Sequence, residues 1–120
     1  MENPLQSLTL QLREFAAARD WAQFHSPKNL ACALSVEAAE LLEHFQWLTE
    51  AQSRDLTPQK KEAVGQEIAD VLLYLLQLAD QLGLDPASEA SRKLALNALK
   101  YPVHQARGKA GSADAASGRE

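Results

Sequence analysis

Four dipeptides that join a helix-capping residue to proline place the strongest constraint on how this 120-residue chain can fold. They are Asn3-Pro4, Ser26-Pro27, Thr57-Pro58 and Asp85-Pro86. A side-chain acceptor followed by proline is typical of a helix start, because proline lacks only an N–H that would be unpaired there anyway. No strand pattern lies between them. The chain is therefore predicted to be all-α, with helices over about 4–19, 27–48, 58–82 and 86–100 in a four-helix bundle.

The remaining segments are predicted to be connections and a tail. Residues 19–25 form a short irregular link, residues 50–57 a polar loop, and Pro102 stops the last helix. A hydrophobic content of 46% excludes general disorder, and the length suits one domain. That domain is expected over residues 1–104. Residues 105–120 are rich in Gly, Ala and Ser without periodicity and are expected to be a disordered tail.

Two pairs of carboxylates stand in otherwise apolar helical segments: Glu37 with Glu40, and Glu67 with Asp70. Residues three apart share one face of a helix. A solvated helix face is the alternative, but the apolar neighbours leave little polar surface around either pair. Four carboxylates gathered in a buried place stay ionised only if cations hold them. Oxygen ligands favour a hard divalent ion, so the pairs predict a Mg²⁺ site, with Mn²⁺ as a substitute.

The third helix carries more apolar side chains than one face can hold. Its predicted core stripe consists of Val64, Ile68, Val71, Leu72, Leu75, Ala79 and Leu82. Leu73, Leu76 and Leu78 lie off that stripe and are also apolar. A helix apolar on two sides in so short a chain predicts a homo-oligomer.

Two further groups could contact a ligand. Lys93, Asn97 and Lys100 share a face at the end of the last helix, next to Tyr101, and Lys28 lies in the first turn of the second helix. An ordinary solvated helix end is the alternative; beside a metal, these side chains would bind phosphate oxygens. The other group is aromatic and could hold a planar base, although core packing is the alternative for each member: Trp21, Phe24, His25, Trp47 and Tyr74.

Charge and motif content exclude several classes of function. The net charge of −4 gives no basic surface for a nucleic acid polymer. Cys32 is the only cysteine, which indicates a reducing compartment, and we expect a cytoplasmic protein without a signal peptide or membrane span. The sequence has no Glu-x-x-His pair of di-iron bundles, no Cys-x-x-Cys, no His-Glu-x-x-His and no Walker-type phosphate loop.

Glu37-x-x-Glu40 followed by Glu67-x-x-Asp70 resembles the motif of the all-α nucleoside triphosphate pyrophosphohydrolases, the MazG-like superfamily. The resemblance covers about residues 7–107. Within it, the flanking segments are similar to the dCTP pyrophosphatase branch: residues 19–30, 45–47, 70–75 and 97–102. One departure is Ala95, where that branch often carries an acidic residue, and it bears on base or sugar recognition.

The resemblance implies hydrolysis of a (deoxy)nucleoside triphosphate, dCTP or a modified dCTP, to the monophosphate and pyrophosphate, which sanitises the nucleotide pool. It also implies a tetramer with sites completed across subunits. The four carboxylates would hold Mg²⁺ and carry catalysis, and Lys93 and Asn97 would balance phosphate charge. Other side chains would hold the base and sugar: Trp21, His25, Trp47 and Tyr74. A non-catalytic helical module for nucleotide sensing or oligomerisation is the alternative hypothesis.

Overall fold

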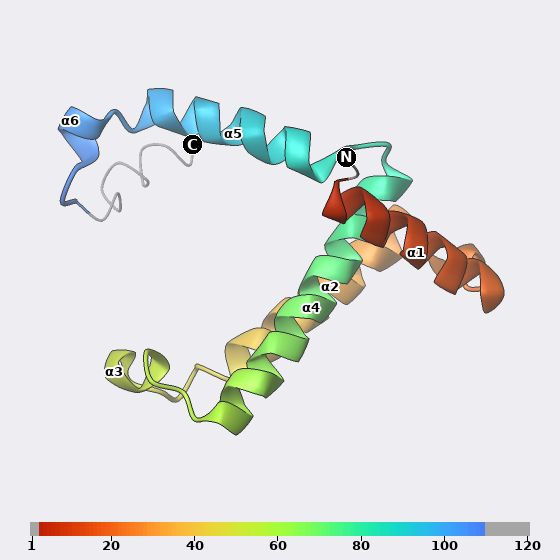
Figure 1. Cartoon of the computed structure of the whole chain (residues 1–120), viewed down its shortest axis with the longest axis horizontal. Coiled ribbons are helices and arrows are strands. Elements are labelled where there is room, and N and C mark those ends of the chain that lie inside the picture. The colour runs from red at the N-terminus through yellow and green to blue at the C-terminus, as the bar shows by residue number, and fades with distance from the viewer. Residues whose placement is uncertain (1–2, 110–120) are drawn as a thin grey trace. The chain divides into compact units, whose positions relative to one another are not determined.

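The computed structural model describes residues 3–109, which form helices and turns and contain no strand. The chain divides into two compact units, Met1–Leu84 and Asp85–Glu120. Figure 1 follows the helices along the chain. The first unit contains α1 (Pro4–Ala18), the 3₁₀ turn η1 (Ala22–Phe24), α2 (Pro27–Glu43), α3 (Glu50–Ser53) and α4 (Pro58–Gln81). The second contains α5 (Pro86–Lys100) and α6 (Val103–Ala106).

All four predicted helix starts are confirmed. In each, the side chain of the capping residue accepts a hydrogen bond from a backbone N–H two or three residues further on, at 2.9–3.2 Å. Proline occupies the first turn of α1, α2, α4 and α5. These local interactions satisfy N–H groups that a helix leaves unpaired at its start, so the caps fix where each long helix begins.

Three boundaries differ from the prediction. The helix expected over 27–48 ends at Glu43, and turns follow. The segment expected to be a loop contains α3, whose start is a capping box in which Thr49 and Gln52 each accept the other's backbone N–H. The short helix α6 crosses the boundary expected between residues 104 and 105. The rest of the expected tail, residues 110–120, lies outside the described residues.

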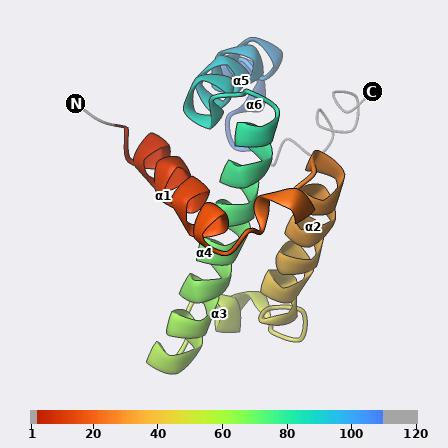
Figure 2. The ribbon, with the colours of Figure 1, turned by 90° about the vertical axis from the view of Figure 1, so that its right-hand side faces the viewer.

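Within the first unit, α4 packs against both α2 and α1. Figure 2 shows α4 between them. The buried apolar side chains of the described residues come from all three helices: Ala16, Leu30, Val64, Leu76 and Ala79. Leu30 on α2 and Leu76 on α4 are each only 1% exposed, so they are the most deeply buried side chains of the described residues.

The predicted core stripe of α4 was partly wrong. Leu76, expected off the stripe, is fully buried, whereas Ile68, Leu75 and Leu82 are 53%, 43% and 53% exposed. The last three residues are spaced seven apart and therefore form a straight apolar seam along α4. Periodicity showed that α4 has two apolar sides, but it could not show which side α1 and α2 would cover.

A bidentate ion pair also ties α1 to α4. The Arg13 guanidinium donates to both carboxylate oxygens of Asp80, at 2.8 and 2.5 Å. Hydrogen bonding to Arg13 lowers the pKa of Asp80, against the opposing effect of burial. This pair links the two helices at one point, in the two-bond geometry in which a guanidinium and a carboxylate match best.

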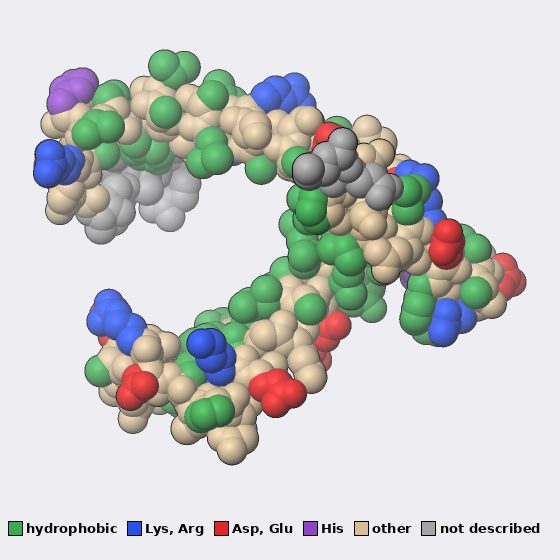
Figure 3. Space-filling model, in the orientation of Figure 1, with side chains coloured by type: hydrophobic (Ala, Val, Ile, Leu, Met, Phe, Trp, Pro, Cys, Tyr) green, Lys and Arg blue, Asp and Glu red, His purple; other side chains and the backbone are tan. Residues whose placement is uncertain are grey.

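The second unit presents apolar side chains to solvent. On α5, Leu94, Leu96 and Leu99 are exposed, as is Val103 on α6. Figure 3 shows hydrophobic side chains on the surface of α4 and also on α5. Among residues 3–109, no helix combines the length and apolar character needed to cross a membrane.

Candidate metal centre

The contact between α2 and α4 brings together carboxylates that are distant in sequence. Glu37 on α2 and Glu67 and Asp70 on α4 each offer one oxygen, and these oxygens all lie within 4.8 Å of one another. All three side chains are half-buried, and Glu40 is more exposed. The helical i, i+3 spacing explains the geometry, because it turns both carboxylates of α4 toward the same neighbour.

One oxygen of the cluster is buried without a partner. Glu67 Oε1 is inaccessible to solvent and receives no hydrogen bond from the described residues. Glu67 also contacts Glu40, but two carboxylates can share a hydrogen bond only if one of them carries a proton. A buried acceptor in this position costs free energy unless a proton or a cation satisfies it.

The electrostatics of the cluster reflect this crowding. The pKa of Glu67 is raised to about 7, first by hydrogen bonding with Glu40, then by burial and by the negative charges of Glu37, Glu40 and Asp70. The pKa of Glu37 is raised by its hydrogen bond with Glu40, then by burial. The pKa of Glu40 is lowered, because its ionised form accepts hydrogen bonds from Glu67 and Glu37. Near neutral pH the cluster therefore holds a proton that a cation could replace.

The cluster meets the chemical requirements of a hard divalent cation. Three convergent carboxylate oxygens form the kind of donor set that Mg²⁺ and similar ions take, and one of the three residues, Glu67, has a buried oxygen without a partner. Among the described residues, the cluster contains no thiolate or imidazole that would favour a softer metal.

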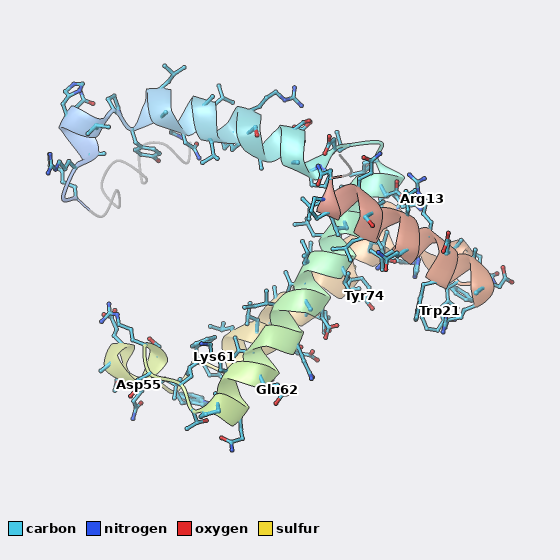
Figure 4. The ribbon with its side chains drawn as sticks, viewed as in Figure 1. Arg13, Trp21, Asp55, Lys61, Glu62 and Tyr74 are labelled. Carbon is cyan, nitrogen blue, oxygen red and sulfur yellow. The ribbon has the colours of Figure 1, made fainter. Side chains whose placement is uncertain are left out.

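A cavity of about 190 Å³ in the first unit includes Asp70 in its wall. Three predicted base-binding residues line it as well: Trp21, His25 and Tyr74. Figure 4 labels Trp21 just beyond the end of α1 and Tyr74 on α4. The structure thus brings these aromatic side chains to the same cavity as one residue of the carboxylate cluster.

The link between α1 and α2 shapes the aromatic side of this cavity. Asp20, shortly after the end of α1, has a φ of 53°, a left-handed conformation that Asp tolerates better than most residues. Trp21 then meets the Phe15 ring edge to face, with 5.8 Å between centroids, and the Arg19 guanidinium lies 3.6 Å from the centroid of Phe15. These contacts hold Trp21 against α1.

Other predicted ligand residues are not brought to this cavity within the first unit. Trp47 follows α2 and is 86% exposed, and it is not part of the cavity wall. Lys28 is exposed in the first turn of α2. The remaining four belong to the second unit, where their role stays a prediction: Lys93, Asn97, Lys100 and Tyr101. In that unit, the Lys100 ammonium lies 5.8 Å from the centroid of the Tyr101 ring.

The sequence interpretation missed the part of the cavity that α1 and Gln77 supply. Leu12, Phe15 and Ala16 line it from α1, and Leu73 and Gln77 from α4. Gln77 could have been found, because it lies three residues after Tyr74 and seven after Asp70, on the same helix face. The α1 side chains had no such signal, since their spacing is that of any amphipathic helix.

Comparison with known proteins agrees with the motif. The MazG-like family matches residues 32–112. The dCTP pyrophosphatase 1 proteins of Rattus norvegicus and Homo sapiens are each 43% identical to the chain, over 99 and 96 residues that make up 81% and 78% of it. These matches cover 58% and 56% of the relatives, so the chain spans a little over half the length of the curated relatives it matches.

A solved structure is similar over most of both chains. The crystal structure of a pyrophosphatase from Archaeoglobus fulgidus superposes with a TM-score of 0.79 at 42% sequence identity, covering 85% of this chain and 95% of that one. The family match covers more than half of the chain, and the helical fold and paired carboxylates agree with it. The chain therefore belongs to the MazG-like family.

Proposed function

We propose that this protein hydrolyses a (deoxy)nucleoside triphosphate, dCTP or a modified dCTP, to the monophosphate and pyrophosphate with the help of Mg²⁺. The observation that carries the proposal is that Asp70 belongs both to the carboxylate cluster and to the wall of the aromatic cavity. A cation site for phosphates and an apolar slot for a base therefore adjoin each other. The names of the similar proteins, dCTP pyrophosphatase 1 and a pyrophosphatase, support the same reaction.

The cation would be held by Glu37, Glu67 and Asp70, whose oxygens converge. When bound, Mg²⁺ would neutralise charge on the triphosphate and act as a Lewis acid toward the phosphoryl group. Mn²⁺, with similar preferences for oxygen ligands, should substitute for it.

The remaining steps fall to side chains of this chain. Glu40 lies outside the convergent trio and is the most exposed of the four carboxylates, so it is available to accept a proton from the attacking water. Trp21, His25 and Tyr74 enclose the base and sugar. The phosphate oxygens that the cation leaves free would be bound by Lys93, Asn97 and Lys28, with Lys100 and Tyr101 beside them. Trp47 would add further stacking on the base.

We further propose that the protein is a homo-oligomer, a tetramer, in which the four-helix bundle is completed. The exposed seam of Ile68, Leu75 and Leu82 on α4 supports this assembly, because apolar side chains in a row are seldom left in water. The exposed Trp47 would also gain a partner surface. A cytoplasmic location and a catalytic domain over residues 1–104 belong to the same proposal.

Pyrophosphate release from a panel of nucleoside triphosphates, with Mg²⁺, Mn²⁺ or chelator, tests the proposal. The wild type should release pyrophosphate from dCTP or a 5-substituted dCTP only with metal. The Asp70→Asn substitution should lower the turnover rate by orders of magnitude. Glu62→Gln is the matched control, because Glu62 is an exposed carboxylate on α4 outside the cluster (Figure 4). Metal-independent nucleotide binding without pyrophosphate release would instead favour the non-catalytic module.

A further inference from the structure

Gln77 lies at the junction of two cavities in the first unit. It lines the 190 Å³ cavity that contains Asp70 and Tyr74, and also an adjoining cavity of about 130 Å³ that contains Arg13 and Asp80. His25 is shared by the two cavities as well. Gln77 is half-buried and lines both cavities, so part of its side chain borders this space.

The hydrogen bond that Gln77 makes fixes which end of its amide can meet a ligand. Its Nε2 donates to the backbone carbonyl of Leu73 at 3.3 Å. A carbonyl can only accept, so the amide nitrogen must point to Leu73 and Oε1 must be the free end. No group among residues 3–109 donates to Oε1. The cavity wall therefore presents an acceptor that a ligand donor can satisfy.

The position of Gln77 along α4 matches the length of a nucleotide. Asp70 and Gln77 are seven residues apart, which is two helical turns or about 10.5 Å. Tyr74 lies between them on the same face, and all three line one cavity. A nucleotide with its phosphates at the carboxylate cluster would pass Tyr74 and bring the polar edge of its base to Gln77.

We propose that Gln77 is a specificity-determining residue that selects a base with an exocyclic amino group, and so selects cytosine over uracil or thymine. Cytosine presents an amino donor where thymine and uracil present a carbonyl oxygen. The amino group would donate to Gln77 Oε1, whereas a carbonyl would face it and leave two acceptors unpaired. The inference rests on the proposed function, because it takes the phosphates to lie at the cluster.

Calorimetric titration of the full chain with dCMP and with dUMP, in the presence of Mg²⁺, measures the two affinities and tests the inference directly. The wild type should bind dCMP about tenfold more tightly than dUMP. This ratio is what one hydrogen bond, together with the cost of leaving its acceptor unpaired, contributes to binding. Gln77→Met keeps the side-chain length and the helix propensity but removes the acceptor. It should therefore abolish the difference in affinity between dCMP and dUMP, mainly by lowering the affinity for dCMP. Gln77→Glu keeps an acceptor at this position and should keep the order of the two affinities.

Gln66→Met is the matched control, because Gln66 is exposed on the same helix and lines neither cavity. It should leave the dCMP preference intact. A wild type without that preference, a Gln77→Met variant that retains it, or no binding of either nucleotide would each overturn the inference. Parallel assays of dCTP and dUTP hydrolysis separate the two proposals. Gln77-dependent binding without pyrophosphate release refutes the hydrolase, and hydrolysis with a base preference indifferent to Gln77 refutes only the selector.

Discussion

Mg²⁺ binding should be strongly pH-dependent near neutrality, because Glu67 has to lose a proton to become a metal ligand. In the metal-free protein its pKa is raised to about 7, well above its ordinary value of 4.5. Between these two pH values Glu67 is therefore protonated in the folded protein and ionised in the unfolded protein. The metal-free fold should lose stability as pH rises through 7, whereas stabilisation by Mg²⁺ should grow over the same range.

The size of the effect follows from the titration of one group. With a pKa of about 7, roughly one Glu67 in eleven is ionised at pH 6 and ten in eleven at pH 8. The apparent affinity for Mg²⁺ should therefore rise about tenfold between pH 6 and pH 8, with release of up to one proton per site at the acid end.

Isothermal titration calorimetry at pH 6, 7 and 8, in buffers of different ionisation enthalpy, measures both the affinity and the protons released. Glu40→Gln removes the largest cause of the raised pKa, since an amide in place of Glu40 can donate to the Glu67 carboxylate. The affinity of this variant should change little over the same range. Glu62→Gln should behave as the wild type. Equal affinities at pH 6 and pH 8 for the wild type, with no proton release, would refute the reasoning.

Four further perturbations test other parts of the structure. Asp70→Asn removes one of several like charges, so the metal-free variant should melt at the same temperature as the wild type or higher. Mg²⁺ should raise the Tm of the variant far less than that of the wild type. A variant that melts well below wild type yet still turns over nucleotide would contradict the metal site. Leu75→Glu places a charge in the exposed seam of α4 and should yield smaller species in sedimentation velocity, unless the seam faces water in solution. Leu76→Ala empties a fully buried position and should lower the free energy of unfolding by about 2–5 kcal/mol in chemical denaturation. Trp47→Ala should raise KM and should reduce discrimination between bases more than it reduces metal affinity. Loss of stacking on the base would cost about 1–3 kcal/mol of binding free energy. An unchanged base preference would assign Trp47 to packing.

The start of every long helix could be read from the sequence, because the signal is local. Asn3, Ser26, Thr57 and Asp85 cap helices through side-chain contacts that span only two or three residues. The end of α2 was harder to predict, since neither Gly nor Pro follows Glu43. The capping box of α3 was present in the sequence between Thr49 and Gln52, and the polar composition of that segment obscured it.

The carboxylate cluster could be predicted for a similar reason, and the cavity beside it only in part. Spacing alone puts Glu67 and Asp70 on one face of α4, and the α2 pair has the same spacing. Which apolar side of α4 would be buried depends on where α1 and α2 pack, and that is a tertiary property. For that reason Leu76 was expected outside the core, and the contribution of Phe15 to the cavity wall was not expected at all.

The weak attachment of α1 has a consequence for motion. Among the described residues, this helix contributes one buried side chain, Ala16, and Arg13 links it to Asp80, yet Leu12 and Phe15 form a wall of the larger cavity. A helix with so little buried surface opens locally at lower free energy than its neighbours. Its amide hydrogens should thus exchange with solvent sooner than those of α4, and faster in high salt, which screens the ion pair. A ligand enclosed by that wall would slow this exchange, so α1 is where occupancy of the cavity should be most visible.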